Sequence, residues 1–200
     1  MEGVYFLWLL WIVWIWSTFF MEKHAPRRFS LSILSLGTIA VYPYVIDIST
    51  LSIQVAAIVI FLFCMIELTS YSLLEKLKLL IYSLTICAGT GGFMLMKIFD
   101  PVWVIFDPKW MLSLFLFFLI QMMTPGDLKK SMLSLYLGLF FGHAATAILL
   151  NQWGMNMPIG SPEILDVAAY VSTIFLAIEG MKVISGYFEA KQNIGKGKQG

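Results

Sequence analysis

The sequence predicts an all-α protein, a polytopic transmembrane bundle of about seven helices with its N-terminus outside and its C-terminus inside. Three observations support this prediction. Hydrophobic residues make up 60% of the 200-residue chain and charged residues only 12%, whereas a soluble domain carries about 25% charged residues. Uncharged stretches of about 20 residues, long enough to cross a bilayer as helices, recur along the chain. Lysine and arginine concentrate in alternate connections between these stretches.

This composition excludes several classes of protein. A cytosolic or secreted globular enzyme, a nucleic-acid binder and a disordered tail would each carry more charge. Seven spans of about 20 residues would leave roughly 60 residues for loops and tails, too few for a second folded domain. We therefore expect the lipid bilayer as the main surrounding, no nucleic-acid partner, and any activity within the bundle or on its short loops.

Local signals delimit the spans in the first half of the chain. The first span is expected to be retained, because Met1-Glu2 lacks the basic region of a secretory signal. The segment after the first span contains Pro26, which breaks the helix, and Pro43 lies close to the far end of the second span. The charged run Glu75–Lys78 separates the third span from the fourth. The expected spans are residues 3–21, 29–46, 53–71 and 79–96.

Cap and turn signals delimit the second half. The pairs Asp100-Pro101 and Asp107-Pro108 have the form of a helix N-cap followed by a first helical residue. They predict a short helix at the membrane surface and then the fifth span. Thr124–Asp127 is a turn signature, and Ser161-Pro162 begins the last helix, whose Glu163 and Asp166 favour a helix N-terminus. The expected spans are residues 110–123, 132–150 and 162–187, in a single bundle over 1–187 with a basic cytoplasmic tail over 188–200.

The positions of the basic residues predict the orientation. Lys97 and Lys109 would lie on one side of the membrane and the other eleven basic residues on the opposite side. Cytoplasmic loops carry the excess of lysine and arginine, so the second side is expected to be the inner one. Removing the seventh span would leave the basic tail outside, against this rule. The eleven residues are Lys23, Arg27, Arg28, Lys76, Lys78, Lys129, Lys130, Lys182, Lys191, Lys196 and Lys198.

Small residues predict which helices pack most closely. Helices in lipid associate where small side chains let their backbones approach. The sixth span has Ser134, Gly138, Gly142 and Thr146 at intervals of four, the fourth has the pairs Thr85/Gly89 and Ala88/Gly92, and the seventh has Ala169, Thr173 and Ala177. We expect these three spans to form the packed centre, with the tryptophan-rich first span at the periphery.

Two polar residues within the spans are candidates for function. His143 is the deepest ionisable group, and a titratable residue at mid-membrane suggests a proton relay. The plainer interpretation, a neutral imidazole hydrogen-bonded to a Ser or Thr of the next helix, is favoured because no carboxylate accompanies it. Thr90, within a glycine-rich run, could be compared with the nucleophile of an intramembrane serine protease, although packing glycines explain the same pattern.

Three charged residues are expected near the cytoplasmic ends of the third and seventh spans. Glu67, Glu179 and Lys182 could form a gate for an ion or a substrate. A structural ion pair that neutralises awkward charges is the favoured interpretation, since Lys182 lies one helical turn after Glu179.

No catalytic, cofactor-binding or metal motif is recognised in the sequence. Cys64 and Cys87 lie inside spans with no CxxC pattern and are expected to be packing thiols. Walker, HExxH, dinucleotide and haem-attachment signatures are all missing from the printed sequence. We therefore expect no cofactor, and an enzyme is the least favoured class.

Two segments resemble the YphA family of small Bacillus membrane proteins. They are the opening Met1-Glu2-Gly3 with its tryptophan-rich helix, and the run Phe99-Asp100-Pro101-Val102-Trp103-Val104-Ile105-Phe106. The length and the layout of the spans are similar as well. The resemblance implies a Gram-positive, spore-forming host and a multi-pass protein of the plasma membrane. It implies no activity and no site residue.

Two functional hypotheses follow. The first is an accessory or structural membrane component that binds other membrane proteins or a second copy of itself. The second is a small transporter or channel for a neutral or weakly polar solute, which would need Thr38, Thr90, His143 and Ser172 to line one polar cavity. A weak match at an offset of 101 residues, such as Gly37 with Gly138, would also relate spans one to three to spans five to seven, as in repeat-built transporters.

Overall fold

The computed structural model describes residues 2–22, 25–48 and 51–196, and in these ranges it contains seven α-helices and one β-hairpin. A π-helical turn, η1 (Trp16–Phe20), extends the first helix, and a 3₁₀ turn, η2 (Pro101–Trp103), precedes the fifth. The helices are α1 (Val4–Ile15), α2 (Pro26–Val41), α3 (Val55–Thr69), α4 (Leu73–Phe99), α5 (Pro108–Met123), α6 (Leu128–Gln152) and α7 (Pro162–Lys196). By length and composition, α4, α6 and α7 up to Gly186 are candidates to cross a membrane.

A β-hairpin replaces part of the expected second and third spans. α2 ends at Val41, and the chain continues as strand β1 (Val45–Ile48), which pairs antiparallel with strand β2 (Leu51–Gln54) before α3 begins. The spans expected over 29–46 and 53–71 are therefore only partly helical. Pro43 explains the early end of α2, because proline has no backbone N–H to continue the helical hydrogen bonds. The β-branched residues after it favour extended backbone.

The remaining boundaries follow the local signals in the sequence. Asp107 caps α5, its carboxylate accepting the backbone N–H of Lys109 at 2.9 Å. Ser72 and Glu75 form a reciprocal capping box that begins α4 before the expected span over 79–96. α7 begins at Pro162 as expected and runs to Lys196. Residues 197–200 of the expected tail lie outside the described residues.

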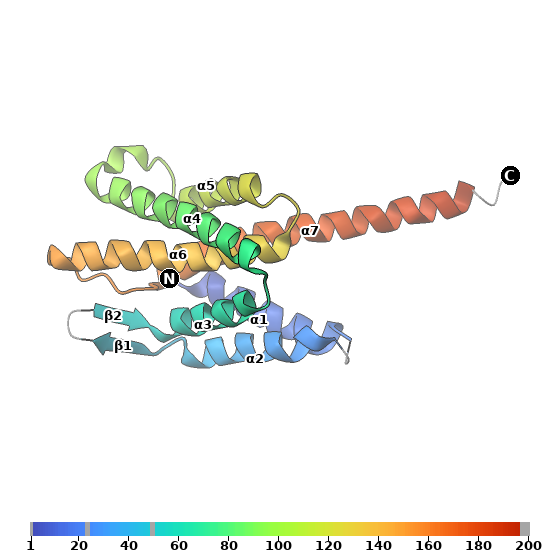
Figure 1. Cartoon of the computed structure of the whole chain (residues 1–200), viewed down its shortest axis with the longest axis horizontal. Helices are drawn as coiled ribbons and strands as arrows, with labels where there is room; N and C mark the ends of the chain where they lie inside the picture. Colours follow the sequence, from blue (N-terminus) through green and yellow to red (C-terminus); the bar gives the residue numbers. More distant parts are fainter. Residues whose placement is uncertain (1, 23–24, 49–50, 197–200) are drawn as a thin grey trace.

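The helices pack around α6, which lies near the middle of the bundle (Figure 1). α4 packs along α6 in the same direction, α5 pairs with α7, and α1 contacts both α2 and α7. The β-hairpin lies at one end of the bundle, which we call the hairpin end, and α7 projects beyond the other helices at the opposite end, which we call the tail end. The main pairings differ between the two halves, α1 with α2 against α5 with α7, so they do not support the weak repeat.

The seam between α4 and α6 is closed by glycines of α6. A Cβ atom on Gly138 would lie 2.5 Å from Ile86 Cβ and 2.8 Å from the Ser83 carbonyl oxygen. A Cβ atom on Gly142 would lie 2.7 Å from the Cys87 carbonyl oxygen. These contacts leave no room for a side chain. The small-residue stripe of α6 therefore faces α4, which is the close approach that helices in lipid require.

The small residues of α4 do not all face this seam. Gly89 faces α5, where an added Cβ would lie 3.0 Å from Phe115 Cε1, and a Cβ on Gly92 would meet nothing within 4 Å. Ala88 and Gly92 are both exposed. The residues of α4 that meet α6 are larger, among them Ile86 and Thr90. The expectation that Ala88/Gly92 packs inside the bundle is therefore not met.

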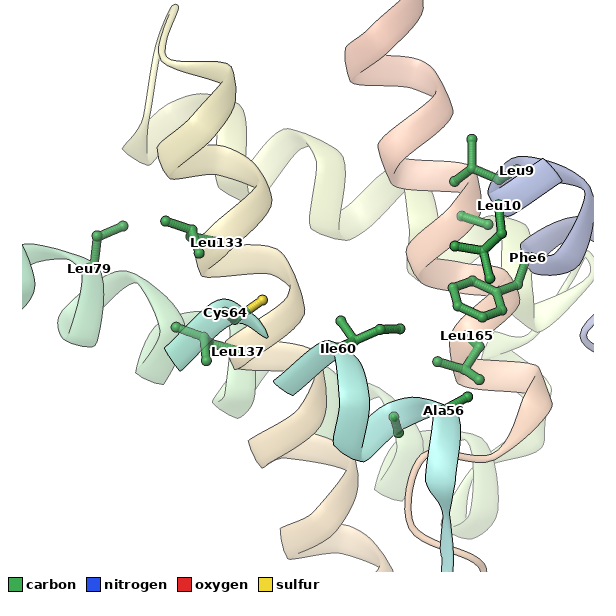
Figure 2. Packing of buried hydrophobic residues seen from close by; sticks show 12 residues of the cluster. Phe6, Leu9, Leu10, Ala56, Ile60, Cys64, Leu79, Leu133, Leu137 and Leu165 are labelled. Atoms are coloured by element: carbon green, nitrogen blue, oxygen red, sulfur yellow. The ribbon is translucent and has the colours of Figure 1, made fainter. Parts of the chain in front are cut away.

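Two hydrophobic clusters fill the bundle. The first joins α1, α3, α4, α6 and α7, and Figure 2 shows its labelled side chains, with Ile60 of α3 lying between Leu137 of α6 and Leu165 of α7. The second joins α4, α5, α6 and α7 around Leu116 and Val171, both fully buried. α6 and α7 contribute to both clusters, whereas α2 contributes no fully buried hydrophobic residue among its described side chains. This places α2 at the periphery of the bundle.

Candidate functional site

The most buried charge of the bundle is Asp166, at the hairpin end. Its carboxylate accepts the backbone N–H of Gly3 at 2.8 Å and that of Phe6 at 3.1 Å, so it caps α1 from another helix. Lys109 Nζ lies 3.1 Å from the same carboxylate, and the Asp166 side chain is fully buried. Gly3 has a φ of 82° and its Cα faces the Tyr42 hydroxyl, so a side chain here would be both strained and obstructed. Asp166 therefore ties α1, α5 and α7 together.

The second lysine at the hairpin end is also neutralised. Lys97 Nζ, near the end of α4, lies 2.7 Å from Glu163 Oε1 in the first turn of α7. Lys97 and Lys109, the two lysines at the hairpin end, are thus paired with the two acidic residues at the start of α7. Next to Asp166, the ring of Tyr170 stacks on Trp110 at 4.3 Å and packs against Tyr5 at 4.8 Å. At this end of the bundle, ion pairs and aromatic contacts join four helices, α1, α4, α5 and α7.

His143 holds the connection that leads into α7. It is fully buried, and its Nδ1 accepts the backbone N–H of Gly160 at 3.0 Å. Its Nε2 lies 3.3 Å from the Ser161 hydroxyl oxygen. Gly160 has a φ of 72°, and a Cβ there would collide with Ala57 of α3. His143 thus fixes a glycine turn that lies between α3 and α6.

The His143–Ser161 pair has the wrong tautomer for a nucleophilic dyad. Nδ1 accepts a backbone hydrogen bond, so in the neutral ring the proton is on Nε2, which donates to the serine oxygen. A general base would need a free lone pair on Nε2 to take the hydroxyl proton. The adjoining cavity is about 30 Å³ and its lining is mostly apolar, with Phe61 and Leu139 among the lining residues. The arrangement fits a hydrogen-bonded anchor.

The other polar residues expected at mid-depth lie apart from one another. Thr38 Oγ1 donates to the Leu34 carbonyl of its own helix, and Ser172 shares a 3.0 Å hydrogen bond with the Tyr136 hydroxyl. Thr90 lies in the α4–α6 seam against Gly142, and its hydroxyl is one of two buried side-chain oxygens without a partner in the described part of the chain. These side chains and His143 therefore do not converge on one cavity.

The charges expected as one cytoplasmic cluster form separate pairs at the tail end. Glu67 Oε2 lies 2.8 Å from Lys129 Nζ of α6, and that ammonium also lies 5.1 Å from the centre of the Tyr71 ring. Lys182 Nζ lies 3.2 Å from Glu179 Oε2, one turn earlier on α7, and both side chains are exposed. The expected pairing of Glu179 with Lys182 is present, but Glu67 has a different partner.

A further charged group at the tail end surrounds a cavity. Lys130 Nζ lies 3.3 Å from Glu75 Oε1 of α4 and 3.2 Å from Asp127 Oδ2. Burial raises the pKa of Asp127, but hydrogen bonds from the Lys130 backbone and side chain outweigh it and hold the pKa below its usual range. The adjacent cavity has a volume of about 230 Å³. Its lining residues are Glu75, Lys78, Leu79, Tyr82, Met123, Thr124, Pro125, Asp127 and Lys130.

Sequence reasoning missed the partners of these residues. It treated Asp166 only as favourable to a helix N-terminus and Lys129 and Lys130 only as orientation signals. The one available signal was the match in number between the two lysines and the two acids of α7 at the hairpin end. Within residues 2–22, 25–48 and 51–196, no group of three or more His, Cys, Asp or Glu side chains could hold a metal ion.

Comparison with known proteins gives one match over nearly the whole chain. A family model described as YphA-like integral membrane protein matches residues 2–200. No curated protein and no solved structure matches the chain.

Proposed function

This chain belongs to the YphA-like family of integral membrane proteins, and on that premise we propose that it acts as an accessory component that binds another membrane protein. We further propose that it crosses a bacterial plasma membrane seven times, with the hairpin end outside and the tail end in the cytoplasm. The charge pattern supports this orientation, because the hairpin end has only Lys97 and Lys109, both paired with acids of α7.

The lengths of the helices bear on the number of spans. α4 and α6, with 27 and 25 residues, exceed the length of about 20 that a bilayer requires. α3 has 15 residues, and β2 extends its hairpin end. The backbone of β2 is paired on both sides, with β1 and with Ile159, which suits a position at the membrane boundary where free N–H groups are costly. These features support seven crossings in which adjoining segments, such as β2 for α3, add to the length of the short helices.

The exposed face of α4 is the observation on which the binding role depends. Ala88 and Gly92, four residues apart, lie on this face, with nothing within 4 Å of a Cβ built on Gly92. The opposite face of α4 packs on α6. In lipid, apolar surface alone gives little drive for association, and small residues at this spacing permit close helix contact. We infer that a helix of another membrane protein packs here.

The alternative, a small transporter or channel, has less support. It requires a shared polar cavity, but Thr38, His143 and Ser172 are hydrogen-bonded to different elements. The cavity beside His143 is about 30 Å³ and mostly apolar.

Site-specific photo-crosslinking tests the binding role. A photo-reactive residue at Ala88 should give a protein adduct in native membranes, whereas one at Ala40, which is also exposed, on α2, should give lipid adducts. Gly92→Leu should abolish the Ala88 adduct, and Ala40→Leu should leave it intact. The mass of the adduct distinguishes a second copy of this chain from a different protein. Lipid adducts alone at both positions would refute the proposal.

A further inference from the structure

The cavity at the tail end lies where the charged and apolar parts of the chain meet. On α4, Lys78 is the last charged residue before an uncharged stretch that begins with the buried Leu79. Across the cavity, Met123 is the last residue of α5. Asp127 is the N-cap of α6, whose first turn is charged. In an integral membrane protein this boundary lies at the level of the lipid headgroups. The cavity of about 230 Å³ is below the range of about 300–1,000 Å³ typical of drug-sized ligands.

The charges around the cavity sum to zero but are unevenly matched. Lys130 is shared by two carboxylates, Glu75 at 3.3 Å and Asp127 at 3.2 Å, so this group has one excess negative charge. Lys78 lines the same cavity, and among the described side chains no carboxylate lies within 4.0 Å of its ammonium. An ionised carboxylate has about four acceptor sites, so Glu75 and Asp127 can each accept a further donor. Among the described residues, the lining thus offers Lys78, a cation without an ion-pair partner, and the pair Glu75 and Asp127, which share a single lysine.

We propose that this cavity binds the headgroup of a phospholipid that carries both a phosphate and a primary ammonium group. The phosphate would accept from Lys78 and from the Tyr82 hydroxyl, and the ammonium would donate to Glu75 or Asp127. The buried Leu79 and the Met123 side chain would contact the glycerol end of the lipid. Exposed apolar side chains of the same two helices, Ile81 on α4 and Phe118 and Met122 on α5, offer a surface for its acyl chains.

The same charges disfavour other headgroups. A headgroup with only a phosphate would meet Lys78 but also the two carboxylates, whose like charge opposes it. A choline headgroup has no N–H and cannot donate to the acidic pair. The property that identifies this site is therefore its preference for a headgroup with a primary ammonium over a choline headgroup and over a headgroup with only a phosphate. The inference does not depend on the docking face of α4 or on the orientation of the chain in the membrane.

Competition between lipids in micelles containing the purified full-length protein tests this inference. Native mass spectrometry would measure how much phosphatidylethanolamine, phosphatidylcholine and phosphatidylglycerol the protein retains from an equimolar mixture. We expect the protein to retain about ten times more phosphatidylethanolamine than either of the other lipids. A tenfold ratio corresponds to the free energy of about one hydrogen bond to a charged group. Asp127→Asn should reduce this ratio to about one, because it removes the excess negative charge that favours the ammonium. Lys78→Gln should instead lower the retention of all three lipids about tenfold, because each of them carries the phosphate that Lys78 contacts.

Lys76→Gln is the matched control, because Lys76 belongs to the same charged run but does not line the cavity. It should leave both the ratio and the total amount of lipid retained unchanged, as should Gly92→Leu on the docking face. Since Lys78 makes no ion pair with a described residue, Lys78→Gln should preserve the thermal stability of the protein. Equal retention of the three lipids, or a preference for phosphatidylglycerol, would overturn the inference. Displacement of the bound lipid by equimolar glycerophosphoethanolamine would also overturn it, by showing that the ligand is a soluble zwitterion.

Discussion

The two ends of the bundle use charge in different ways. At the hairpin end, Asp166 is fully buried and its oxygens contact two backbone N–H groups and Lys109. At the tail end, Glu75, Asp127 and Lys130 keep about a third or more of their side chains exposed, and they surround a cavity. A buried ion that loses its partner is far more costly than an exposed one. The hairpin end is therefore a fixed anchor, whereas the tail end keeps capacity for a ligand.

The largest expected effect is at Asp166. Asp166→Ala would leave the largely buried Lys109 ammonium unpaired and would uncap α1, so we expect a loss of about 3–5 kcal/mol in the free energy of unfolding. Titration of the protein in dodecylmaltoside micelles with sodium dodecyl sulfate would measure it. Asp107→Ala removes only an exposed cap and should cost about 1 kcal/mol. Similar losses in the two variants would remove the contrast between buried and exposed charge.

His143 should give the next largest effect. His143→Ala leaves the Gly160 N–H without its acceptor, and we expect a loss of about 1–3 kcal/mol in the same titration. His143→Asn is the control, since the amide oxygen can occupy the position of Nδ1 and accept the same hydrogen bond. It should recover part of the loss. If Asn and Ala were equally destabilising, the hydrogen bond to Gly160 would not be the reason that His143 matters.

At the tail end, Lys129 should matter less. Its ion pair with Glu67 and its contact with the Tyr71 ring are both partly exposed, so Lys129→Met should cost about 1 kcal/mol or less. Raising the salt concentration should shrink the difference between wild type and variant, because exposed pairs are screened. A loss as large as that of Asp166→Ala would contradict the difference between the two ends.

The smallest effect is expected for Glu179 and Lys182 of α7, at the tail end of the bundle. Both are exposed, and a double-mutant cycle of Glu179→Ala and Lys182→Ala should give a coupling energy of about 0.3–0.5 kcal/mol. A coupling energy of zero would show that the two side chains lie close together without stabilising the protein. A coupling above about 2 kcal/mol would indicate that another structure covers this part of α7.

The sequence predicted the helices well where composition decides the outcome. The apolar stretches, the cap at Asp107, the start of α7 at Pro162 and the glycine stripe of α6 are local properties, and they lie where they were expected. The hairpin was missed because Val45, Ile46 and Ile48 are as hydrophobic as a membrane helix. Only Pro43 distinguishes the two, by stopping the helix.

The partners of the polar residues could not be predicted, since pairing is decided by three-dimensional packing. Lys109 and Asp166 are 57 residues apart in the chain, and no periodicity relates them. The Ala88/Gly92 pair of α4 has the same spacing as the glycines of α6, yet it faces outward. Spacing identifies a surface suited to close packing but does not say which helix covers it.

Cysteine labelling of intact cells is the most direct test of the proposed orientation. In that orientation the hairpin end lies outside the cell and the tail end in the cytoplasm. In a background with Cys64 and Cys87 replaced, single cysteines at Val102 and Met155 would report the hairpin end, and one at Gly126 would report the tail end. An impermeant maleimide should label the first two positions in intact cells and should reach Gly126→Cys only after permeabilisation. Labelling of Gly126→Cys from outside, or protection of both hairpin-end positions, would contradict the account.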